Sequence, residues 1–110
     1  MVKAISKQLK GVFIGEIRQN REVQQDHFLM KVVLPASFAS PYPGQFVMIK
    51  VAGLNEPFLG RPISIYSFRR KKTFCTLELL FRVVGKGTEI LAGLIEGSQV
   101  EIHGPLGGCF

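Results

Sequence analysis

The sequence predicts a small all-β fold: a six-stranded antiparallel Greek-key barrel with one short helix between the fifth and sixth strands. Six runs of alternating apolar residues are separated by polar breaks and by loops that contain glycine or proline, a pattern typical of antiparallel sheets. Helical spacing of apolar residues appears once, shortly before the last run. Six strands in 110 residues leave no room for the crossovers of a parallel sheet, and closure into a barrel removes exposed strand edges.

Composition and length fit one compact domain. Hydrophobic residues make up 46% of the chain, which argues against disorder. The chain has no apolar run of membrane-spanning length and no signal-peptide core at its N-terminus, so a cytoplasmic location is expected. Two cysteines, Cys75 and Cys109, are too few for a disulfide framework, and with two histidines they do not assemble a structural metal site. Cys75 lies in an apolar run and is expected to be a small core residue.

The first half of the chain contains three predicted strands. Residues 1–9 are expected to form a tail or a short leading strand. The first main strand covers 10–23, with Gly15 as a possible bulge and a break at Asn20–Glu22. The second strand covers 26–34 and alternates clearly. After a proline-containing loop, residues 44–51 form a third strand that is apolar on both faces, as in a barrel.

The second half begins with a loop over 53–60 and a fourth strand to about Phe68. The longest strand candidate covers 73–84. A helical pattern follows within 85–97, with Thr88 as the N-cap candidate and Gly97 as the stop.

A last short strand over 98–103 completes the six, and the glycine-rich segment 104–108 is expected to be a tight turn.

The fourth strand carries the most informative residues, Leu59–Ser67. Alternation places Ile63 and Ile65 on one face, and Pro62, Ser64 and Tyr66 on the other. The second face is suited to serve as a wall for a flat aromatic ligand, with Arg61 at the strand mouth to hold an anionic end. The alternative is a turn that opens an ordinary half-buried strand.

Two further features indicate an anion site. The glycines of Gly85–Thr88 allow backbone N–H groups to converge at a helix start, where a phosphate or pyrophosphate is stabilised. The same glycines also serve simply to link strand to helix. Arg82 interrupts an apolar strand and therefore needs a counter-charge, which a ligand phosphate, Glu78 or Glu101 would supply.

Other chemistry is not indicated. The net charge of +6 raises the possibility of nucleic-acid binding, but the basic run Arg69–Lys72 lies between two strands and is expected to be a solvated hairpin tip. His27 and His103 are expected to be polar residues at strand edges. No carboxylate pair, Walker loop or Rossmann fingerprint is present. The residues therefore predict a barrel that binds a flat ligand with a phosphate tail, without a catalytic side chain.

Four segments together resemble a known family, the FAD-binding domain of ferredoxin-reductase-like flavoproteins. They are 43–46 (Pro-Gly-Gln-Phe), 61–65 (Arg-Pro-Ile-Ser-Ile), 82–88 (Arg-Val-Val-Gly-Lys-Gly-Thr) and 104–107 (Gly-Pro-Leu-Gly), in the family's order and spacing. The resemblance extends from about residue 10 and is closest to the electron-transfer subunits of dihydroorotate dehydrogenase type B.

The resemblance implies FAD as the cofactor and a set of residues that bind it. These are Arg61, Pro62, Ile63, Ser64, Leu80, Phe81, Arg82, Gly87 and Thr88. In this family Arg61 is expected to reach the pyrophosphate or ribityl region and Ser64 the N5 edge of the flavin. The stretch 80–82 would follow the ribityl chain and adenosine side, and residues 87–88 would contact the pyrophosphate.

The resemblance also implies a larger assembly. Residues 10–103 would be the FAD-binding barrel, and 104–110 the start of a linker to a nicotinamide-binding domain that this chain does not contain. NAD and a [2Fe–2S] cluster are expected only in that missing C-terminal part, so the chain alone would lack complete activity, as a truncated piece or a stand-alone remnant. The expected partner is the dihydroorotate dehydrogenase catalytic subunit, in a hetero-oligomer of pyrimidine biosynthesis; neither nucleic acid nor a membrane span is expected.

Three alternatives remain. In the first, the chain is part of a related sulfide dehydrogenase, ferredoxin–NADP reductase or sulfite reductase. In the second, it is a small basic oligonucleotide-binding barrel, and in the third, it is a structural remnant that has lost its flavin. Aromatics among exposed basic residues would favour the oligonucleotide-binding barrel. The nine phenylalanines are instead spread along strands and loops.

Overall fold

The computed structural model describes residues 11–53 and 60–107, which form six strands and one helix. The elements are β1 (Val12–Gln24), β2 (His27–Pro35), β3 (Phe46–Val51), β4 (Arg61–Arg70), β5 (Phe74–Arg82), α2 (Lys86–Ala92) and β6 (Gln99–Leu106). Within these residues no helix is long and apolar enough to span a membrane. The expected tail at 1–9 lies outside the described residues, as does Cys109.

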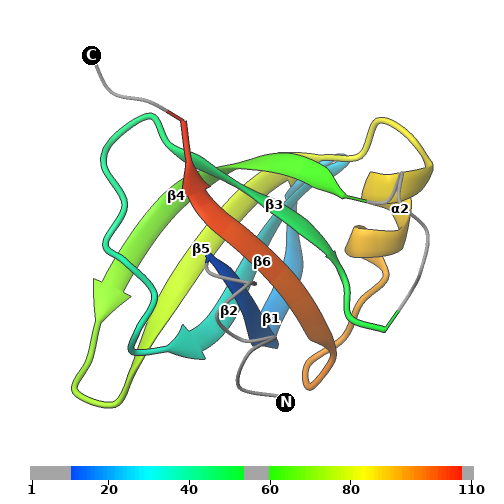
Figure 1. Cartoon of the computed structure of the whole chain (residues 1–110). Helices are drawn as coiled ribbons and strands as arrows, with labels where there is room; N and C mark the ends of the chain where they lie inside the picture. The colour runs from blue at the N-terminus through cyan, green and yellow to red at the C-terminus, as the bar shows by residue number, and fades with distance from the viewer. Residues whose placement is uncertain (1–10, 54–59, 108–110) are drawn as a thin grey trace.

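All six strands pair antiparallel in a closed barrel with the order β1-β2-β5-β4-β3-β6 (Figure 1). Strands β3, β4 and β5 follow one another as hairpins, and β6 returns to lie beside β3, which is the Greek-key connection. Pairing of β1 with β6 closes the sheet, so none of these strands has a free edge. The predicted fold class is confirmed, including the helix between β5 and β6.

Apolar side chains on the inner faces of the strands fill the barrel. Alternate residues of β2 and β5 point inward, among them Met30, Val32, Leu77 and Leu79, each with 0% of its surface exposed. Phe38, from the connection between β2 and β3, is fully buried and packs edge-on against Phe13.

Helix α2 lies at one end of the barrel and contributes the buried Leu91 (Figure 1). Cys75 is also fully buried, as expected, and this burial raises the pKa of its thiol.

The predicted break at Asn20–Glu22 is wrong. These three residues pair with Phe28–Met30, so β1 continues to Gln24. The chain reverses instead at Gln25–Asp26, where Asp26 adopts a left-handed φ of 61° that aspartate tolerates in tight turns. Cross-strand pairing in a long hairpin therefore overrides the low strand propensity of a polar segment.

The ends of the last two elements also differ from the prediction. The N-cap of α2 is Gly85 rather than Thr88, and its C-cap is Gly93 rather than Gly97. Strand β6 runs on to Leu106 through segment 104–106, which was expected to be a turn. Pairing of Leu106 with Phe46 of β3 extends this strand beyond what its own sequence predicts.

Gly15 is not a bulge; it allows close packing between β1 and β2. It pairs regularly with Val100 of β6. A Cβ atom at this position would lie 2.4 Å from Cγ1 of Val32 and 2.9 Å from Cδ2 of Leu34. The two register shifts of β1 against β2 occur instead between Ile17 and Gln19 and between Glu22 and Gln24. The glycine is therefore needed for side-chain packing, not for backbone freedom.

Substitution Gly15→Ala should lower the free energy of unfolding by about 1–3 kcal/mol, because an added methyl overpacks the β1–β2 contact. Chemical denaturation measures the change. Gly60→Ala is the matched control, since a Cβ there would approach only Cε of Met48, at an ordinary 3.8 Å. The control should change stability by no more than about 0.5 kcal/mol. Equal losses in the two variants would contradict the packing role of Gly15.

Candidate functional site

The start of β4 and the end of β5 form the walls of a groove of about 400 Å³. The two strands pair antiparallel with Ser64 opposite Leu80. Ile63 and Phe81 face the core and are 5% and 6% exposed, so their neighbours point outward. The outward side chains from the two strands are those of Pro62, Ser64, Leu80 and Arg82, and all four line the groove. The predicted alternation of β4 is thus confirmed at this end of the strand.

The third side of the groove is the segment that leads into α2. Val84, Gly85 and Thr88 line it, together with Arg61 from the start of β4. Eight of the nine residues predicted as the site therefore line one groove, and Gly87 is the exception. Gly87 lies beside it, because a Cβ atom there would be only 2.6 Å from Nε of Arg61. The absence of a side chain at Gly87 lets Arg61 cross the start of the helix.

Gly85 belonged to the predicted anion site Gly85–Thr88, whereas sequence reasoning did not single out Val84. Val84 is 71% exposed, which is unusual for an apolar residue that ends a buried strand run. Tyr66, expected on the same wall as Pro62 and Ser64, points outward and is 61% exposed, but it does not line the groove. A register shift between Ile65 and Ser67 makes it the extra residue of a β-bulge.

Thr88 is the third residue of α2, and its hydroxyl fixes the segment before the helix. The hydroxyl oxygen accepts the N–H groups of Val84 (2.8 Å) and Gly85 (3.1 Å), and its proton is donated to the carbonyl of Gly85 (3.0 Å). These bonds use the hydroxyl both as acceptor and as donor, so the side chain of Thr88 holds the backbone that precedes the helix. The first-turn N–H groups have no acceptor within the helix.

Arg82 is exposed, contrary to the expectation of an arginine in a buried strand that needs a counter-charge. The two carboxylates considered as its partners are engaged elsewhere. Glu78 accepts the hydroxyl proton of Ser67, and Glu101 pairs with Nζ of Lys50 at 3.7 Å. Lys50–Glu101 is the only ion pair within residues 11–53 and 60–107. Arg61 and Arg82 thus give the groove two positive charges that no described carboxylate neutralises, which suits an anionic ligand.

The C-terminal end of α2 is held by Asn20, a residue of β1 that the sequence analysis did not single out. Its amide Nδ2 donates to the carbonyls of Leu91 (2.9 Å), Ala92 (3.3 Å) and Leu94 (2.9 Å). Carbonyls at the end of a helix have no partner within it, and such bonds stabilise them. Because the contact joins residues more than 70 positions apart, no local sequence pattern indicates it.

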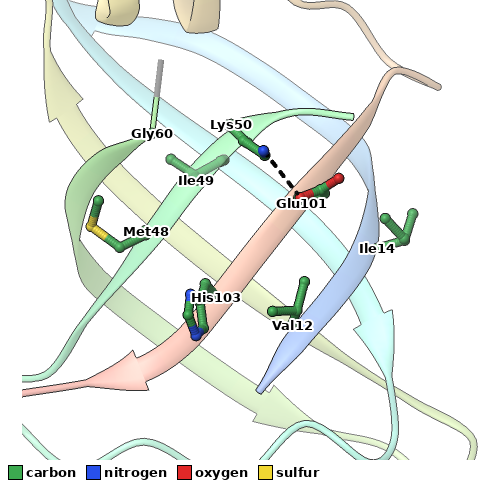
Figure 2. Close-up of a pocket in the computed structure, with 8 residues that line it drawn as sticks. All are labelled: Val12, Ile14, Met48, Ile49, Lys50, Gly60, Glu101 and His103. Carbon is green, nitrogen blue, oxygen red and sulfur yellow. Dashed lines mark ion pairs between the residues drawn. The ribbon is translucent and has the colours of Figure 1, made fainter. Parts of the chain in front are cut away.

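A larger hollow of about 700 Å³ lies on the outer face of β1, β6 and β3 and contains none of the predicted residues (Figure 2). Its lining is mostly apolar, with Val12, Ile14 and Met48, and its two opposite charges already form the Lys50–Glu101 pair. His103 is exposed on this face, but β6 pairs there with both β1 and β3, so the expected position at a strand edge is wrong. In the described part of the chain, no three His, Cys, Asp or Glu side chains converge as metal ligands would.

Residues 15–110 match the family described as oxidoreductase FAD-binding domain. The chain is 41% identical over 102 residues to the dihydroorotate dehydrogenase B (NAD(+)) electron transfer subunit of Desulforamulus reducens, a match that covers 93% of this chain and 38% of that protein. It is 33% identical over 91 residues to the subunit of the same name from Fusobacterium nucleatum, over 83% and 34% of the two chains. The chain thus spans less than two fifths of either relative.

A solved structure, the ferredoxin reductase in carbazole 1,9a-dioxygenase, superposes with a TM-score of 0.70 at 22% identity. The superposition covers 87% of this chain and 28% of that one, and it shows that the two share the barrel fold.

Substitution Asn20→Asp should lower the free energy of unfolding by about 1–3 kcal/mol, because a carboxylate cannot donate to three carbonyls and is repelled by a helix C-terminus. Denaturant titration at neutral pH measures the loss. Gln19→Glu makes the same amide-to-acid change at an exposed neighbour in β1 and should be nearly neutral. If both variants lose the same stability, the bonds of Asn20 do not hold the helix.

Proposed function

This chain belongs to the family of oxidoreductase FAD-binding domains, and we propose that it is the flavin-holding part of a dihydroorotate dehydrogenase electron transfer subunit. The proposal assigns the groove between β4, β5 and α2 as the FAD site. The observation that carries it is the arrangement of Arg61, Arg82 and Gly87. Both arginines line the groove without a described carboxylate partner, and Arg61 passes close to Gly87, the residue without a side chain in the first turn of α2. Such a groove suits a dinucleotide with a central pyrophosphate.

Different residues of the groove would contact different parts of FAD. Arg61 and Arg82 would hold the phosphates by charge-assisted hydrogen bonds, with backbone N–H groups of the helix start beside them. Pro62 and Leu80 offer apolar contact to a flat ring, and Ser64 an exposed hydroxyl between them. FAD, when bound, supplies the capacity to accept hydride and release single electrons. The chain's own part is to bind and orient it.

The proposed partner is the catalytic subunit of dihydroorotate dehydrogenase, to which the flavin would pass electrons in pyrimidine biosynthesis. Support comes from the two relatives, both named as electron transfer subunits of that enzyme. The barrel would occupy residues 10–103, with 104–110 leading toward a nicotinamide-binding domain. NAD and a [2Fe–2S] cluster would belong to the length of the relatives that this chain does not span. A cytoplasmic location is part of the proposal, and cell fractionation checks it.

Titration of FAD into the purified chain, followed by quenching of flavin fluorescence, tests the site directly. Arg61→Gln and Arg82→Gln should each weaken binding about ten- to a hundredfold, because each removes charge-assisted bonds to phosphate. Arg21→Gln, at an exposed arginine of β1 outside the groove, is the matched control and should leave the affinity unchanged. Unchanged affinity in both groove variants, or no flavin bound by the unaltered chain, would overturn the proposal.

A second variant separates binding from stability. Gly87→Ala places a methyl carbon 2.6 Å from Nε of Arg61, so the arginine must move away from the helix start. The fold tolerates this movement because an arginine side chain is flexible, and alanine favours a helix more than glycine by about 1 kcal/mol. FAD affinity should therefore fall by about tenfold while the free energy of unfolding stays the same or rises.

Gly93→Ala, at the other end of α2, is the matched control for this variant, since a Cβ there meets only ordinary contacts of 3.6 Å or more. It should leave FAD affinity as it is. If Gly87→Ala binds FAD as well as the unaltered chain does, Arg61 does not hold the cofactor from its present position.

A further inference from the structure

A second hollow, of about 530 Å³, lies on the outer face of β1, β2, β5 and β4 and is ringed by positive charge. We call its four cationic residues the basic face: Arg18, Lys31, Arg69 and Lys71. They come from three separate parts of the chain, because Arg69 and Lys71 belong to one basic run and Arg18 and Lys31 lie on β1 and β2. No single run of basic residues therefore indicates the whole surface. The remaining lining is Val33, Ser67, Phe74, Thr76 and Glu78.

Strand pairing explains why these cations meet. Lys31 of β2 is opposite Glu78 of β5, and Glu78 is opposite Ser67 of β4. Two residues along the strands, and hence on the same face, Thr76 of β5 is opposite Arg69 of β4. The inner faces of β2 and β5 fill the core, which forces these residues outward onto one surface. The basic face is therefore fixed by the register of the barrel.

The charge of this surface is not neutralised within the described chain. Its single carboxylate, Glu78, accepts a hydrogen bond from Ser67, and the one ion pair of the described residues, Lys50–Glu101, does not involve the basic face. The lining thus carries four cations and one carboxylate, a net charge of +3. Like charges held close together repel one another, and an acidic partner would relieve that repulsion.

Arg70 does not belong to the basic face, although it lies between two of its members in sequence. Its guanidinium donates to the carbonyls of Ala36 (2.7 Å) and Phe38 (2.5 Å) and lies 5.2 Å from the ring centroid of Phe68. The run Arg69–Lys72 is therefore not uniformly a solvated tip, as the sequence suggested. Arg70 anchors it, and this anchor sets the place of Arg69 and Lys71.

The basic face adjoins the groove assigned to FAD. Both lie on the outer surface of β4 and β5: the groove contains the pair Ser64–Leu80, and the lining of the second hollow contains the next outward-facing pair, Ser67–Glu78. Only Tyr66, the bulge residue, separates Ser67 from Ile65 on β4, and its side chain is 61% exposed. A protein bound on the basic face would consequently lie beside the flavin groove.

We propose that the basic face is the docking surface for an acidic patch of the protein that exchanges electrons with the flavin. The proposal rests on the proposed function, because the position beside the groove matters only if the groove holds FAD. Charge complementarity identifies the partner as acidic. Phe74 is the only aromatic residue that lines the surface, whereas single-stranded nucleic acid is usually bound by a series of aromatic platforms. An acidic protein surface is therefore the occupant.

The test compares two double variants that each remove two positive charges from exposed or half-buried strand and turn positions. Lys31→Gln with Arg69→Gln alters the basic face, whereas Arg21→Gln with Lys72→Gln alters cations that do not line it. The probes are a labelled oligoglutamate peptide and the dihydroorotate dehydrogenase catalytic subunit, each measured at low and at physiological ionic strength. Circular dichroism confirms that both variants are folded.

The basic-face variant should bind both probes at least about tenfold more weakly than the unaltered chain, with a flatter dependence on salt. The control variant should bind them as the unaltered chain does. Equal weakening of probe binding in the two variants overturns the proposal. Tighter binding of the unaltered chain to an oligothymidylate than to a peptide of the same length overturns it as well. FAD titration on the same samples separates the two hypotheses. If the chain binds FAD but the basic-face variant binds both probes as tightly as the unaltered chain does, only the docking surface is refuted.

Discussion

The antiparallel pairing of β4 with β5 is the interaction on which both surfaces of this molecule depend. Because the barrel is closed and its interior is filled by alternate side chains, every other residue of these strands must point outward. Ser64 and Leu80 meet in the groove, and Ser67 and Glu78 meet in the basic face. The bulge at Tyr66 lies between the two pairs, so it allows one strand to serve two surfaces of different character.

Helix α2 illustrates how a short element becomes part of a site. Seven residues are too few for a helix to be stable alone, so its position depends on contacts from elsewhere in the chain. Asn20 of β1 bonds the carbonyls at its C-terminal end, and Arg61 of β4 passes over Gly87 at its start. The hydroxyl of Thr88 fixes the segment that leads into it. Both ends of the helix are therefore positioned by the barrel.

Much of the candidate site could be predicted because it lies in short segments with distinctive residues. The alternation of β4 placed Pro62 and Ser64 outward, and the glycines before α2 indicated a helix start. The environment of Arg82 was mispredicted, since a strand rich in apolar residues has one exposed face in a small barrel. The assignment of Thr88 as the N-cap was also wrong, because an extended Gly85 serves as the N-cap and Thr88 is the third residue of the helix.

The sequence by itself determined the strands, their inward faces and the motifs that place this chain among FAD-binding domains, because period-two alternation and glycine-rich turns are local properties. Tertiary structure alone decided which distant residues meet. Asn20 reaches α2 across more than 70 positions, and Arg18, Lys31 and Arg69 share a surface only through register. Register is a property of pairs of strands, and a shift of one residue would turn every outward side chain inward. The basic face is therefore specified by the closed barrel rather than by any segment of the chain.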